Sequence, residues 1–133
     1  MRLLLIAALL LPVIAAAAEQ VSCHYSYGGE TRVLVAQPVA SPYAVAAVAV
    51  GSYFQFRVVF QNEPADQAAI KVYTYADRDE GLVPIHQATY AYPPAAAANA
   101  RHGFTGLNFV YEPVRDGELQ YWCRMEEAPR LSG

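Results

Sequence analysis

Three histidines and one methionine carry the side chains best suited to hold a transition metal: His24, His86, His102 and Met125. Imidazole nitrogen and thioether sulfur are ligands that suit copper. The histidines are far apart in the chain, and none belongs to an H-x-H or H-E-x-x-H pair, the spacings that place two ligands side by side. A metal site would therefore need the fold to bring distant strands together. We predict that the protein holds no metal and no cofactor, and we keep these four residues as weak candidates.

Groups that could catalyse a reaction are present, but no motif organises them. No serine lies in a G-x-S-x-G motif, and no other pattern supports a triad of serine, histidine and carboxylate. The acidic turn at residues 77–81 has the alternating carboxylates of a calcium loop, yet it lacks the later ligands and contains Arg78. Carboxylate pairs for sugar hydrolysis can be drawn from five acids: Glu63, Asp77, Asp79, Glu112 and Glu118. Because any chain with 12 acids offers such pairs, the sequence predicts a protein that is not an enzyme.

The only two cysteines, Cys23 and Cys123, each lie among apolar residues with a period of two. Val21 and Tyr25 share a strand face with Cys23, and Tyr121 shares one with Cys123. Their separation of 100 positions excludes a C-x-x-C motif, and in an exported protein it favours a structural disulfide over free or intermolecular thiols. We predict a Cys23–Cys123 bond that joins the first strand to the last. Such a bond removes both thiols as nucleophiles.

Tyrosine is the residue in excess, and several of the ten tyrosines form Tyr-x-Tyr pairs: Tyr25/Tyr27, Tyr73/Tyr75 and Tyr90/Tyr92. A period of two places each pair on one face of a strand. Ile70 and Val72 alternate with Tyr73 and Tyr75, so a core that takes the first two leaves the tyrosines facing outward. Two interpretations stay open. The tyrosines either complete ordinary sheet packing or form an aromatic platform that binds a protein or stacks on a sugar.

Trp122 immediately precedes Cys123, and a cysteine that faces the core turns the tryptophan toward solvent. An exposed tryptophan calls for a partner or a covering loop. The loop at residues 93–106 is the natural cover. The candidate binding surface therefore combines tyrosines, the tryptophan and residues of this loop: Tyr73, Tyr75, Tyr90, Tyr92, Trp122, Arg101, His102 and Phe104.

The chain opens with the pattern of a signal peptide. Arg2 is followed by an apolar segment at residues 3–14 and by four alanines at 15–18 that offer A-x-A cleavage sites. Residues 1–18 are predicted to be removed, so that no membrane anchor remains and 115 of the 133 residues form the mature chain. Loss of Arg2 changes the net charge from −3 to −4, which argues against nucleic acid and anionic lipid as partners. We predict a periplasmic or secreted protein.

Short strands separated by turns account for most of the mature chain. They are predicted at residues 21–27, 31–36, 53–61, 69–76, 82–92, 106–112 and 118–125, with a less regular extended segment at 44–50. Pro38 and Pro42 are expected to break the pairing after the second strand.

This pattern predicts one antiparallel β-sandwich of immunoglobulin-like architecture at residues 19–125, with seven to eight strands, and a disordered tail at 126–133. A small closed barrel is the alternative. The immunoglobulin pattern places its tryptophan on a middle strand, whereas Trp122 is beside a cysteine, and the sequence indicates no specific family.

Together these features favour an exported, non-catalytic module that binds another exported protein as an accessory or adaptor. The alternative is a periplasmic protein that binds a small ligand or copper through its histidine and aromatic residues. The first hypothesis depends on aromatic side chains that face outward. The second depends on histidines that the fold brings together.

Overall fold

The computed structural model of the protein describes residues 8–11, 18–95 and 100–129. One sheet contains β1 (Glu19–Tyr27), β2 (Glu30–Ala36), β8 (Asn108–Glu112) and β9 (Gly117–Glu127). The other contains β3 (Pro38–Val39), β4 (Val48–Val50), β5 (Phe54–Gln61), β6 (Ala69–Arg78) and β7 (Gly81–Ala91). Two short 3-10 helices, η1 (Pro42–Ala44) and η2 (Ala65–Gln67), lie in connections. No helix in this part of the chain is long and apolar enough to cross a membrane.

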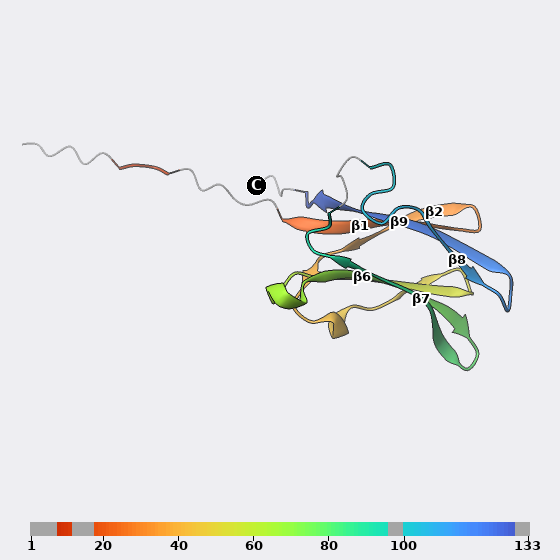
Figure 1. Ribbon diagram of the computed structural model, residues 1–133. Helices are drawn as coiled ribbons and strands as arrows, with labels where there is room; N and C mark the ends of the chain where they lie inside the picture. Colours follow the sequence, from red (N-terminus) through yellow and green to blue (C-terminus); the bar gives the residue numbers. More distant parts are fainter. Residues whose placement is uncertain (1–7, 12–17, 96–99, 130–133) are drawn as a thin grey trace, which may run out of the picture.

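The two sheets pack face to face as the layers of a sandwich (Figure 1). The four-stranded sheet has the order β2-β1-β9-β8, and the five-stranded sheet has the order β3-β5-β6-β7, with β4 also paired to β5. Every pair is antiparallel except β3 with β5. The predicted β-sandwich is confirmed. Most of the predicted signal peptide, residues 1–7 and 12–17, lies outside the described residues.

Alternating side chains of the central strands fill the space between the sheets. The buried core includes Val21, Cys23, Phe54, Phe56, Phe60, Ile70, Val72, Leu119, Tyr121 and Cys123. At its centre the Phe56 ring lies 5.2 Å from that of Tyr25 and 5.3 Å from that of Tyr121, both from the opposite sheet. The period of two that predicted these strands therefore also selects the side chains that hold the layers together.

The Cys23–Cys123 disulfide is present and lies within the four-stranded sheet. The two residues face each other in the antiparallel register of β1 and β9, with their Cα atoms 4.0 Å apart, and both are fully buried. The immunoglobulin disulfide instead joins the two sheets. The predicted bond is confirmed, and it indicates a non-reducing compartment because such bonds persist where thiols are not kept reduced.

The region of residues 38–50 contains more pairing than its prolines led us to predict. Pro38 and Val39 form β3, which pairs in parallel with the end of β5. Proline is tolerated there because an edge strand leaves one side of its backbone unpaired. Pro42 begins η1, and the extended segment predicted at 44–50 contains only β4 as a regular strand.

The last strand is also longer than predicted. Glu127 still pairs with Glu19 on β1, and the Ala128 amide donates to the Ala18 carbonyl at 2.7 Å. Residues 126 and 127, which the sequence assigned to the tail, belong to β9 because the start of β1 offers them a partner strand. Tail residues 130–133 lie outside the described residues.

Candidate functional site

Trp122 lies on the outer face of the four-stranded sheet, the face turned away from the five-stranded sheet. This is the orientation that a buried Cys123 next to it requires. His24, directly opposite on β1, stacks on the indole with ring centroids 4.1 Å apart and an angle of 2° between the planes. The Arg124 guanidinium lies 5.9 Å from the centre of the same indole. These contacts fix the position of a ring that stays half-buried.

The described residues of the loop that was predicted to cover Trp122 contact one side of the indole. Gly103 forms a bridge to Cys123, so this part of the loop runs alongside β9. Gly103 has a φ of +61°, and a Cβ there would collide with the Cys123 carbonyl, so this close approach requires glycine. His102 then meets the indole edge-on with ring centroids 6.0 Å apart, while Arg101 is exposed. The described part of the loop therefore supports the tryptophan and leaves it half-buried.

Tyr73 and Tyr75 lie on the opposite side of the sandwich from Trp122. They occupy the outer face of the five-stranded sheet, where their rings stack with centroids 6.2 Å apart. The Arg57 guanidinium lies 5.0 Å from the centre of the Tyr73 ring. The structure therefore does not bring this pair and the tryptophan together in one platform.

Tyr90 and Tyr92 face inward. Tyr90 pairs in register with buried Ile70, so it lies on the core side of β7, where its ring packs edge-on against Phe104 at 5.3 Å. The Tyr92 ring packs against Phe60 with centroids 4.9 Å apart. The register of the β6–β7 hairpin decides which face these tyrosines occupy, and the Tyr-x-Tyr spacing carries no information about that register.

The four weak candidates for metal ligands are divided between the two sides of the four-stranded sheet. His24 and His102 flank Trp122 on the outer face. His86 lies between the sheets, and Met125 packs against the core. Among the described residues, no three side chains of histidine, cysteine, aspartate or glutamate gather closely enough to hold a metal ion. The fold therefore does not assemble the candidate copper site from these four residues.

His24 and His86, the two histidines that lie in strands, both have lowered pKa values. Burial, aided by the nearby positive charge of Arg124, lowers the pKa of His24, and Glu126 opposes this effect. Burial also lowers the pKa of His86, which shares a 2.6 Å hydrogen bond with the Tyr121 hydroxyl across the sheet interface. Both shifts favour the neutral imidazole.

Strand β8 presents its aromatic residues to solvent and its carboxylate to the core. Phe109 and Tyr111 are 60% and 54% exposed, whereas Val110 is buried and Glu112 is 0% exposed. A shift of one residue in the strand would exchange the two sets, burying the rings and exposing the carboxylate. The observed orientation is therefore the inverse of the one that hydrophobicity alone favours.

Strand β2, at the other edge of the same sheet, also presents apolar side chains to solvent. Val33 and Val35 are 52% and 42% exposed. Val33 faces His24 on the outer side, whereas Arg32 faces buried Tyr25 and so points to the inner side. Apolar side chains of both edge strands thus lie on the same face as the tryptophan, with His24 between Val33 and Trp122 and with Phe109 beside Gln120. We call this surface the outer apolar band: Val33, Val35, Phe109, Tyr111 and Trp122.

Glu112 is stabilised inside the sandwich by two arginines and by the turn after β8. Its carboxylate accepts hydrogen bonds from the Arg78 guanidinium at 3.1 Å and from that of Arg115 at 3.2 Å. Two backbone amides of the turn, those of Val114 and Arg115, also donate to it. Burial alone would raise the pKa of Glu112, but the hydrogen bonds to its ionised form together lower it to about 2. These partners allow the carboxylate to occupy the core while Phe109 and Tyr111 remain outside.

We expect acid to weaken the fold through this carboxylate. The pKa of Glu112 falls from 4.5 to about 2 on folding, so ionised Glu112 stabilises the folded state above pH 4.5, and this contribution is lost as the pH falls through about 2. Urea unfolding of the wild type and of Glu112→Gln between pH 7 and pH 2 measures this contribution to the free energy of unfolding. The variant should be less stable at pH 7 and should show a flatter pH dependence. Glu118→Gln, at an exposed position of β9, is the control, and equal pH dependence in all three proteins would contradict the role given to Glu112.

Sequence reasoning did not select four residues of the outer apolar band. In β2 both faces carry apolar residues, since Leu34 and Ala36 alternate with Val33 and Val35, so the pattern did not fix the outer side. In β8 the aromatic residues alone would predict the opposite orientation. The one signal in the sequence for the orientation of β8 was the spacing of Glu112 and Arg115. An arginine three residues after a glutamate can bind the carboxylate within the turn that follows the strand.

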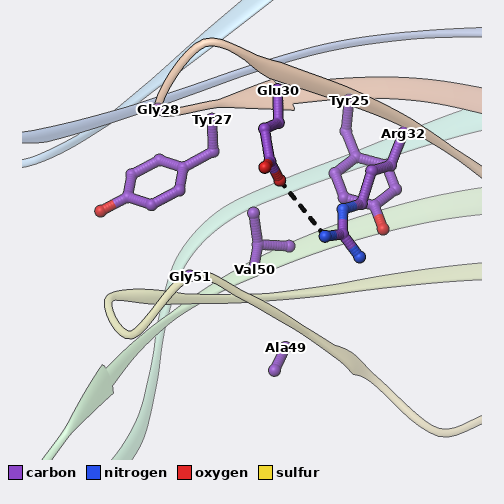
Figure 2. Close-up of a pocket in the computed structure, with 8 residues that line it drawn as sticks. All are labelled: Tyr25, Tyr27, Gly28, Glu30, Arg32, Ala49, Val50 and Gly51. Atoms are coloured by element: carbon purple, nitrogen blue, oxygen red, sulfur yellow. Dashed lines mark hydrogen bonds and ion pairs between the residues drawn. The ribbon is translucent and has the colours of Figure 1, made fainter.

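A separate pocket of 390 Å³ opens between the β1–β2 hairpin and the turn after β4. Figure 2 shows the Glu30–Arg32 ion pair at its edge, with an N–O distance of 3.2 Å, and Gly51 below the Tyr27 ring. Gly51 has a φ of +58°, and a Cβ there would collide with the Tyr27 ring, so glycine allows this close approach. The two charged groups of the pocket are paired with each other.

Comparison with protein-family models, with curated proteins and with solved structures finds no match. The outer apolar band and the pocket are therefore the features from which a function can be inferred.

Proposed function

We propose that the mature chain is an exported, non-catalytic β-sandwich module that binds another exported protein through the outer apolar band, in the periplasm or outside the cell. The observation that carries the proposal is the orientation of β2 and β8. Both edge strands turn apolar side chains to solvent on the same face, although Glu112 must be buried for β8 to do so. A patch of this kind on a soluble protein supports a role in protein interaction.

The composition of the band also favours a protein partner. Trp122, Phe109 and Tyr111 are residue types enriched in the energetically dominant centres of protein interfaces. His24 and Arg124 hold the tryptophan in place, which reduces the entropy lost when a partner orders it. Accessory or adaptor activity fits this arrangement because it requires a rigid surface and no reactive group.

The pocket at the β1–β2 hairpin favours a second candidate function, the binding of a small ligand. Its volume of 390 Å³ falls in the range of small-molecule sites, and Tyr25 and Tyr27 line it. Arg32→Ala would remove the ion pair with Glu30 at this pocket. It should change the affinity for such a ligand without affecting protein capture. A copper titration of the purified mature protein tests the metal-binding form of this alternative.

The protein-binding proposal is tested by capture from a periplasmic extract on immobilised mature protein. Phe109→Glu should reduce the amount of captured partner about tenfold or more, because it places a charge in an apolar contact. Thr89→Glu introduces the same charge at an exposed position of β7 on the opposite face and should leave capture unchanged. Equal capture by both variants, with wild-type unfolding curves, would rule out the outer apolar band as the binding surface.

A further inference from the structure

Strand β2 is the least protected sheet edge among the described residues. β7 contains Pro84 and a register shift opposite it, β8 has only 5 residues, and β3 and β4 have 2 and 3. β2 has 7 residues, no proline and an unbroken register with β1. No strand in the described part of the chain pairs with its other side. A regular edge of this kind is a template for pairing with another strand.

The backbone groups available for such pairing follow from the antiparallel pattern. A Cα distance of 4.0 Å between Cys23 and Cys123 is that of a pair without mutual backbone hydrogen bonds. In an antiparallel strand the backbone N–H and C=O groups of successive residues point alternately to the two neighbouring strands. Cys23 therefore exchanges backbone hydrogen bonds with Leu34 on β2, whereas the next pair, His24 and Val33, does not. The N–H and C=O groups of Val33 therefore point away from β1, as do those of the residues two positions to either side.

We propose that β2 pairs antiparallel with β2 of a second copy of the chain, with Val33 at the two-fold axis. Val33 is the middle residue of the strand, so this register pairs all 7 residues of each copy. Thr31 then faces Val35 of the other copy, and such β-branched pairs are favoured between strands. Moving the axis to Arg32 shortens the pairing and sets two arginines opposite each other, and moving it to Leu34 also shortens the pairing.

The resulting dimer has one continuous sheet, formed by the two four-stranded sheets. An axis perpendicular to this sheet places the outer apolar bands of both copies on the same side. Two adjacent binding faces would raise the avidity for a partner that presents two matching sites. The dimer goes beyond the proposed function and does not depend on it, because its contacts are those of the β2 edge.

Disulfide trapping tests the proposed register. Val33→Cys should form a covalent dimer under mild oxidation because the two introduced cysteines face each other at the axis. Val35→Cys alone should stay monomeric on a non-reducing gel, since it faces Thr31 of the other copy, and a mixture of Thr31→Cys with Val35→Cys should cross-link. The native Cys23–Cys123 bond is fully buried, so we expect it to stay intact in each variant and to serve as an internal reference.

Sedimentation equilibrium supplies the second measurement. The wild-type mature protein should show a concentration-dependent dimer, and Val33→Lys should weaken it about tenfold or more because two lysines would meet at the axis. A monomeric wild type, or cross-linking of Val35→Cys alone as efficient as that of Val33→Cys, would overturn the proposal. Either result leaves partner capture through Phe109 unaffected, so failure of the dimer and failure of the proposed function can be told apart.

Discussion

Replacing both cysteines with alanine should lower the free energy of unfolding by about 2–5 kcal/mol. The bond joins residues 100 positions apart, so its loss allows the unfolded chain many more conformations. It also removes the covalent link at the centre of the β1–β9 pair, where both residues are fully buried. Urea unfolding of the Cys23→Ala/Cys123→Ala variant under non-oxidising conditions measures the change.

The wild-type protein with its disulfide reduced is the matched control, since it lacks the bond but retains both side chains. The free energy of unfolding of the reduced wild type should be lowered by most of the same amount. If the double variant and the oxidised wild type differed by less than about 0.5 kcal/mol, which is typical of neutral surface changes, the stabilising role of the bond would be refuted.

Two phenylalanines on opposite sides of the four-stranded sheet should respond very differently to truncation. Phe56→Ala should lower the free energy of unfolding by about 3–5 kcal/mol, because it opens a cavity between Tyr25 and Tyr121 in the buried core. Phe109→Ala should change it by no more than about 0.5 kcal/mol, because the ring is already 60% exposed.

Denaturant unfolding of the two variants gives both values in one experiment. The comparison matters for function because a ring that contributes little to stability is available to a partner. A loss of about 3 kcal/mol or more in Phe109→Ala would mean that the ring is part of the core, since truncation of a buried phenylalanine costs that much.

The residues of the central strands made much of this fold predictable from sequence. In β5 and β6 a period of two, interrupted in β5 by Val59, assigns one apolar face, and the structure buries that face. The two cysteines carried long-range information, because their pairing implied that the first and last strands are neighbours. The local pattern therefore predicted the middle of the five-stranded sheet, and the covalent constraint predicted the middle of the four-stranded sheet.

The edges of the two sheets were not predictable by the same reasoning. In β8 the orientation depends on Arg78, which comes from the β6–β7 hairpin, and on the turn that follows the strand. In β7 the inward position of Tyr90 depends on the hairpin register. Both are tertiary effects that override the local pattern, and they determine which aromatic residues reach the surface.

The central claim, that the outer apolar band is where a partner binds, is tested most directly by cross-linking from within it. A photoreactive phenylalanine analogue is placed at residue 109 or, as the control, at residue 89 on the opposite face, and each protein is irradiated in the exporting cell. Our account predicts one dominant cross-linked partner from position 109 and little or none from position 89. The same partner cross-linked equally from both positions, or only from position 89, would contradict it.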